Sequence, residues 1–258
     1  VITGLGSLNK ININFSLSGA NVVRIKTISL NVVSGQTDFV IPVSDITNAG
    51  VTTFNMTNIT NTENGCPIFI DHKTDFIVNA PPIVSSIALR INDGCPNLPL
   101  NVAISGLDNL SDALLSYSVS GANAIVSETV ALEVIGGNAN FSIPGTSLPI
   151  SGTNTLVLTN LINSSTGCFT IINSISQNFN ILPVPNNPVA SNQDFCIENE
   201  AKVADLVPNG TQYKWYNSEN ASAPLESNTL LVTGNYYLKE TNQATGCVSN
   251  ATAISVTI

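Results

Sequence analysis

Basic side chains are scarce in this sequence. Eight Lys and Arg stand against 17 Asp and Glu, which gives a net charge of −9 and a pI near 4.3, and the basic residues are scattered. Nucleic acid and anionic membrane surfaces both attract clustered basic residues, so neither is expected as a partner. No run of 18 or more apolar residues occurs either, so no direct membrane insertion is expected.

Charge of either sign is rare. Charged residues make up 10% of the chain, whereas an ordinary soluble domain has about 25%. Ser, Thr and Asn supply the polarity, and hydrophobic residues reach 43%, enough for a buried core. Thr and the β-branched aliphatic residues favour strands, while Asn, Gly and Pro favour the turns between them. The composition therefore predicts an all-β protein.

Catalytic groups are also few. The one histidine, His72, could serve a Ser-His-Asp triad, but the equivalent position of the second repeat described below is not a histidine. Asp71 and Asp75 share a strand face and could form a glycosidase pair, although a solvated edge is the simpler interpretation. No phosphate-binding glycine loop occurs. We expect no catalytic residues, no cofactor and no enzymatic activity.

Calcium is the one metal to consider. The oxygen-rich segment 108–112 begins with Asp108 and ends with Asp112, and its carboxylates could bind this ion. The first repeat has Gly6 and Lys10 at the same places, so such a site would not belong to the repeat. The sequence predicts no metal ligands, and calcium stays open.

An internal repeat organises the chain. Residues 15–66 align without a gap with residues 117–168, and 19 of these 52 pairs are identical. After Cys66 and Cys168 the offset grows by one residue, so that Phe76 aligns with Phe179. Alternating apolar residues and β-branched runs bounded by Gly, Asn or Ser predict short strands throughout, as in antiparallel sandwiches.

The sequence predicts three domains: 1–80, an N-terminally incomplete repeat; 81–186, its second copy; and 187–258, a distinct module. The boundaries fall in the proline-rich segments 79–82 and 182–188, which favour extended, semi-rigid spacers. The expected fold is therefore all-β, with tandem immunoglobulin-like antiparallel β-sandwich domains in an extended rod.

Five cysteines occupy matching places. Cys95 opens the second unit and Cys168 precedes its last strand, and Cys196 and Cys247 do the same in the third. This predicts the disulfides Cys95–Cys168 and Cys196–Cys247 and leaves Cys66 unpaired. Buried free thiols are the alternative, whereas zinc is disfavoured because no Cys-x-x-Cys pair or Cys–His cluster occurs. Disulfides indicate an oxidising, extracytoplasmic location.

The first repeat lacks an opening strand. Val1 aligns with Ala103, which lies eight residues after Cys95, and segment 84–92 has no counterpart. We expect the partner of Cys66, and further domains of the same polypeptide, upstream of Val1.

The aromatic residues of the third unit suggest a second possible role. Trp215 lies mid-strand, where a sandwich needs a core aromatic residue, and Tyr216 should lie on the opposite face. An exposed aromatic platform for a glycan is the alternative to a purely structural role, and the ligand-binding residues are unknown.

The third unit carries six short motifs: Phe195-Cys196, residues 201–206, Lys214-Trp215-Tyr216, residues 234–237, Gly246-Cys247 and residues 253–256. With these motifs the unit resembles the immunoglobulin-like modules near the C-termini of giant Bacteroidetes surface proteins.

This resemblance implies an extracellular, cell-surface location and a large adhesin or gliding-motility protein. Such proteins are exported by the type IX secretion system through a C-terminal domain that is not in this chain. The expected role is a structural stalk or spacer. The alternatives are a module that binds surface polysaccharide and an accessory region of a polysaccharide-degrading enzyme.

Overall fold

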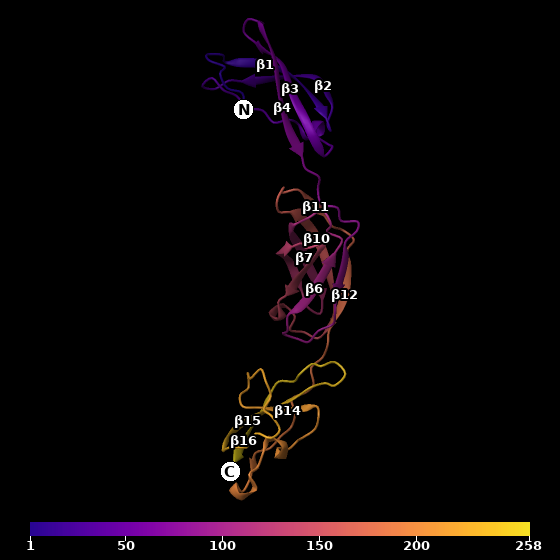
Figure 1. Cartoon of the computed structure of the whole chain (residues 1–258), viewed down its shortest axis with the longest axis vertical. Helices are drawn as coiled ribbons and strands as arrows, with labels where there is room; N and C mark the ends of the chain where they lie inside the picture. The colour runs from indigo at the N-terminus through magenta and orange to yellow at the C-terminus, as the bar shows by residue number, and fades with distance from the viewer. The chain divides into compact units, whose positions relative to one another are not determined.

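The computed structural model describes all 258 residues, and its regular elements are 16 β-strands and four short 3₁₀ helices (Figure 1). Contacts divide the chain into two compact units, Val1–Pro82 with Asn163–Phe169 and Ile83–Ile162 with Thr170–Ile258. Three separate hydrophobic cores form, one each within the first repeat, the second repeat and the third module. The four short 3₁₀ helices lack the length and hydropathy of a membrane-spanning helix.

The second repeat is a sandwich of two antiparallel sheets. The larger sheet has the order β11-β10-β7-β8, with β12 also paired to β10, and the smaller has the order β5-β6-β9. The strands are β5 (Ala88–Ile91), β6 (Leu100–Ser105), β7 (Asp112–Gly121), β8 (Ile125–Glu133), β9 (Asn138–Ile143), β10 (Gly152–Asn163), β11 (Phe169–Ile171) and β12 (Ser176–Ile181), with the 3₁₀ helix η2 (Gly145–Ser147) before β10.

Strand alternation builds this core. On β7 the residues Ala113, Leu115, Tyr117 and Val119 are at most 3% exposed. Successive strand residues point to opposite faces, so these four side chains lie on one face, towards the smaller sheet. The predicted antiparallel sandwich is confirmed here.

The first repeat keeps only the larger sheet. Its order is β2-β1-β3-β4, formed by β1 (Lys10–Gly19), β2 (Val23–Asn31), β3 (Gly50–Asn61) and β4 (Pro67–Val78), with η1 (Val43–Asp45) between β2 and β3. In place of the smaller sheet there is one isolated bridge, between Ile2 and Thr37. Phe39 and Phe54 are only partly buried as a result.

The third module has one regular sheet, of order β13-β16-β15-β14. It consists of β13 (Gln193–Asp194), β14 (Tyr213–Tyr216), β15 (Gly234–Glu240) and β16 (Thr252–Thr257), and β13 runs parallel to β16. The opposite layer is irregular. It includes the 3₁₀ helices η3 (Ile197–Asn199) and η4 (Val203–Asp205), and Trp215 packs into the core between the layers, as predicted.

In both repeats, an asparagine side chain bonds to the backbone of the loop that leads into a central strand, β10 in the second repeat and β3 in the first. In the second repeat the Asn123 side chain accepts from the Ile150 backbone N–H at 2.9 Å and donates to the Ile150 carbonyl at 2.7 Å. In the first, Asn21 makes the same pair of bonds with Asn48, at 2.8 Å each. Both asparagine side chains are nearly fully buried. Each side-chain amide pairs with backbone groups of a loop that has no neighbouring strand to pair with.

Replacing Asn123 by Ala should destabilise the second repeat by about 2–4 kcal/mol. The substitution removes the two part-buried bonds to the Ile150 backbone and the buried bond to Asn154, and each hydrogen bond contributes roughly 0.5–1.5 kcal/mol. Hydrogen exchange of β10 peptides would measure the loss. The exposed Asn101→Ala in the same repeat is the control. Equal protection in the two variants would contradict the assigned role of Asn123.

Candidate functional site

A single disulfide joins two modules. Cys95, in the opening segment of the second repeat, is bonded to Cys247 in the third module, with 5.5 Å between the Cα atoms and 152 residues of sequence separation. Both cysteines lie in the same compact unit. Cys66, Cys168 and Cys196 are free thiols.

The opening segment places Cys95 at the exit of the last strand of its repeat. Gly94 forms a parallel bridge with Ile181, the final residue of β12. The Gly94 N–H donates to the Asn180 carbonyl at 3.0 Å, and the Leu182 N–H donates to the Gly94 carbonyl at 2.7 Å. Cys95 follows directly, so its sulfur lies where the chain leaves the second repeat.

A tight turn places Cys247. The turn joins β15 to β16, and the Asn242 N–H donates to the Cys247 carbonyl at 2.9 Å. The Gly246 N–H donates to the Asn242 carbonyl at 2.7 Å, and Gly246 has φ +77°, which favours glycine. The Cys247 side chain is fully buried, with its sulfur 3.9 Å from the Leu182 carbonyl.

Both predicted pairings, Cys95–Cys168 and Cys196–Cys247, are wrong. Cys95 lies beside Ile181, and Ile181 pairs with the first residue of β10. Cys168 instead lies beside Asn163, the last residue of β10. Eleven strand steps therefore separate the two cysteines, roughly 37 Å at about 3.4 Å per residue. A disulfide needs its Cα atoms within about 7 Å.

The third module repeats this separation. The Phe195 N–H donates to the Thr257 carbonyl, which places Cys196 at the end of β16, whereas Cys247 precedes that strand. Each module therefore carries its two cysteines at opposite ends. Cys66 is a free, exposed thiol.

The candidate catalytic residues form no common site. His72 is exposed on β4, opposite Met56 in the strand pairing. Asp71 forms an exposed ion pair with Lys73 at 3.2 Å, and Asp75 accepts a hydrogen bond from the Thr53 hydroxyl. No group of three or more His, Cys, Asp or Glu side chains is placed to hold a metal ion, and segment 108–112 is no exception.

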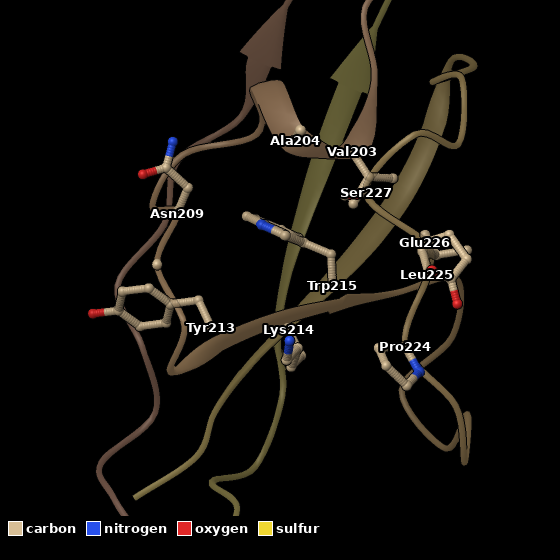
Figure 2. A pocket seen from close by; sticks show the side chains of 11 residues that line it. Val203, Ala204, Asn209, Tyr213, Lys214, Trp215, Pro224, Leu225, Glu226 and Ser227 are labelled. Carbon is tan, nitrogen blue, oxygen red and sulfur yellow. The ribbon is translucent and has the colours of Figure 1, made fainter. Parts of the chain in front are cut away.

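A pocket of about 530 Å³ lies over one face of β14 in the third module. Figure 2 shows the Trp215 indole projecting into it, with Tyr213 and Asn209 on one side and Leu225 on the other. The indole N–H is buried and has no hydrogen-bond partner. Lys214 and Glu226 add one charge of each sign to the lining, so the pocket offers both polar and aromatic surface.

Tyr216 lies on the opposite face of β14, as predicted. It is partly buried and pairs across the sheet with Tyr237, and the Lys239 ammonium lies 4.8 Å from the centre of its ring. This cation–π contact and partial burial restrict the ring, and burial raises the pKa of its hydroxyl.

Comparisons with known proteins give little further guidance. No family model matches the chain, and no curated protein matches it. Among solved structures, the chicken CNTN1 FN1-FN3 domains are 12% identical over 97% of this chain and 90% of theirs, with a TM-score of 0.32. The Sidekick-1 immunoglobulin domains 1-5 are 12% identical over 94% of this chain and 57% of theirs, with a TM-score of 0.20.

Proposed function

We propose that this chain is a structural stalk or spacer region of a large secreted cell-surface adhesin that serves surface attachment or gliding motility. The observation that carries the proposal is the Cys95–Cys247 bridge, which couples consecutive β-modules covalently at their joint. Disulfides are typical of secreted and extracellular proteins, where thiols are not kept reduced. A spacer needs folded modules and firm joints and requires no catalytic centre.

The surface chemistry supports the same role. The net charge of −9 and the Ser-, Thr- and Asn-rich exterior keep the chain soluble without clustered charge that would attract unrelated partners. Export by the type IX secretion system, and an anchor supplied by a C-terminal domain outside this chain, follow from the resemblance of the third unit. Further domains of the same polypeptide would be its main partners, and the chain itself would have no enzymatic activity.

A spacer should be extended in solution. We expect small-angle scattering of the purified chain to give a radius of gyration well above the roughly 18 Å that size scaling predicts for one compact particle of this length. Substituting the prolines of segment 182–188 by Gly should broaden the distance distribution only after the disulfide is reduced. A radius near 18 Å for the unmodified chain would contradict the proposal.

Glycan binding by the third module is the second candidate function. The pocket on β14 favours it, because Tyr213, Lys214 and Glu226 give its lining aromatic and charged surface and the buried Trp215 N–H has no hydrogen-bond partner. A glycan array would test it, with Trp215→Phe as the variant that removes the indole N–H and part of the ring surface and Tyr237→Phe as the control. Binding that falls at least tenfold in the first variant alone would support this function, and absence of binding would eliminate it.

A further inference from the structure

The turn that holds Cys247 occurs three times in the chain. Each copy reads Asn-x-x-x-Gly-Cys, and the three cysteines are Cys66, Cys168 and Cys247. In each, the Asn N–H donates to the Cys carbonyl, at 3.2, 2.9 and 2.9 Å in that order, and the Gly N–H donates back to the Asn carbonyl. The glycines have φ of +71°, +72° and +77°. Cys168 therefore lies in the same turn as the bonded Cys247.

The surroundings of these two cysteines are also equivalent. The disulfide-bonded Cys247 sulfur lies 3.9 Å from the carbonyl of Leu182, and the Cys168 thiol sulfur lies 3.6 Å from the carbonyl of Asn79. Asn79 directly follows β4, as Leu182 directly follows β12.

Strand pairing confirms that equivalence without any sequence alignment. Val78 pairs with Gly50, the first residue of β3, and Ile181 pairs with Gly152, the first residue of β10. Asn79 and Leu182 are thus the same position of the repeat. The Cys168 sulfur therefore lies beside the residue that follows the last strand of the first repeat, as the Cys247 sulfur does for the second repeat.

We propose that Cys168 is one half of a second inter-module disulfide, and that its partner is a cysteine carried by the first repeat at the position equivalent to Cys95. In the repeat register that position is eight residues ahead of Val1, because Val1 aligns with Ala103. Cys66, Cys168 and Cys247 are here called turn cysteines, and Cys95 and its equivalents are called opening cysteines. The proposed rule is that the turn cysteine of each module bonds to the opening cysteine of the module before it. This connectivity goes beyond the spacer role and does not depend on it.

The same rule accounts for the two remaining thiols. Cys196 follows Phe195, whose N–H donates to the Thr257 carbonyl at the end of β16, just as Cys95 follows Gly94 beside β12. It is an opening cysteine, suited to the turn of a succeeding module. Cys66 is a turn cysteine, suited to the opening segment of a preceding one. Both are exposed.

Bond formation is an ordinary thiol–disulfide exchange. The Cys168 and partner thiols together lose two protons and two electrons to form the sulfur–sulfur bond. One molecule of an external low-molecular-weight disulfide accepts both electrons and is reduced to two thiols. Oxidised glutathione is sufficient in a test.

Two extended chains test the proposal. The first carries a copy of residues 84–102 directly before Val1, which supplies both the missing strand and the opening cysteine in register, and the second carries only a copy of residues 93–102. After oxidation with glutathione, non-reduced peptide mapping should link the grafted copy of Cys95 to Cys168, while the original Cys95 stays linked to Cys247. Alkylation of Cys168 should fall at least tenfold relative to the unextended chain.

Matched controls exclude chance pairing. Cys168→Ser in either extended chain should leave the grafted cysteine alkylatable, and Cys66→Ser should change nothing. If the grafted cysteine bonds to Cys66, or if Cys168 stays reactive in both extended chains, the rule is overturned. Scattering by the unextended chain is a separate measurement, so failure of the spacer role would be distinguished from failure of this connectivity.

Discussion

Pulled from its two ends with the disulfide intact, the chain should extend by far less than its full length. Force that enters the second repeat reaches Cys95 and passes through the sulfur–sulfur bond to Cys247, so it bypasses the segment between them. That segment spans 152 residues of sequence and holds nearly all of two cores. Those cores should stay folded under loads that unfold the first repeat.

Reduction should then release the shielded segment. At about 3.3–3.6 Å per extended residue, 152 residues add roughly 500 Å of contour length. Single-molecule force spectroscopy with and without a reductant would measure the gain. Cys247→Ser should show the full extension without reductant, and Cys66→Ser should behave like the unmodified chain. If the unmodified chain already extends fully under oxidising conditions, the bridge does not carry the load.

Truncating Tyr117 to Ala should destabilise the second repeat by about 3–5 kcal/mol, the usual cost of removing a large buried aromatic side chain. Tyr117 is 1% exposed at the centre of β7, and its ring centre lies 5.0 Å from that of Phe141 in the opposite sheet. The cavity would therefore open between the two layers. Hydrogen exchange of β7 and β10 in the intact chain would report the loss. Tryptophan fluorescence would not, because the only tryptophan lies in another module.

Tyr117→Phe is the matched control, because the first repeat carries Phe15 at the same position. It should cost less than about 1.5 kcal/mol at neutral pH. Burial, and secondarily the charge of Glu128, raise the pKa of Tyr117 above 10.0 in the folded state. The stability that the neutral Tyr117 hydroxyl contributes is present below pH 10 and is lost as the pH rises through the raised pKa. Above that pKa the free energy of unfolding of the Phe variant should therefore fall less than that of the unmodified chain. Equal protection in the Ala and Phe variants would contradict the central position of Tyr117.

Local patterns predicted most of the fold. Alternation along β7 and its counterpart β1 identifies the buried face, because a strand residue points to the same side as the residue two positions away. The gapless alignment of residues 15–66 with 117–168 predicted one sheet topology for both repeats, and the shared register of Gly50 with Val78 and Gly152 with Ile181 confirms it. The identical Asn21 and Asn123 were visible in that alignment, but their bonds to a distant loop were not.

Cysteine pairing depended on the tertiary structure. The sequence by itself determined that each module has an opening cysteine or a turn cysteine at a fixed place, and spacing alone suggested that the two belong together. A strand, however, carries the chain about 3.4 Å per residue away from its start, so residues near the two ends of a β-module are separated by its whole length. The end of the second repeat and the start of the third module come together instead, at Leu182. Only the folded chain brings Cys95 and Cys247 to that point.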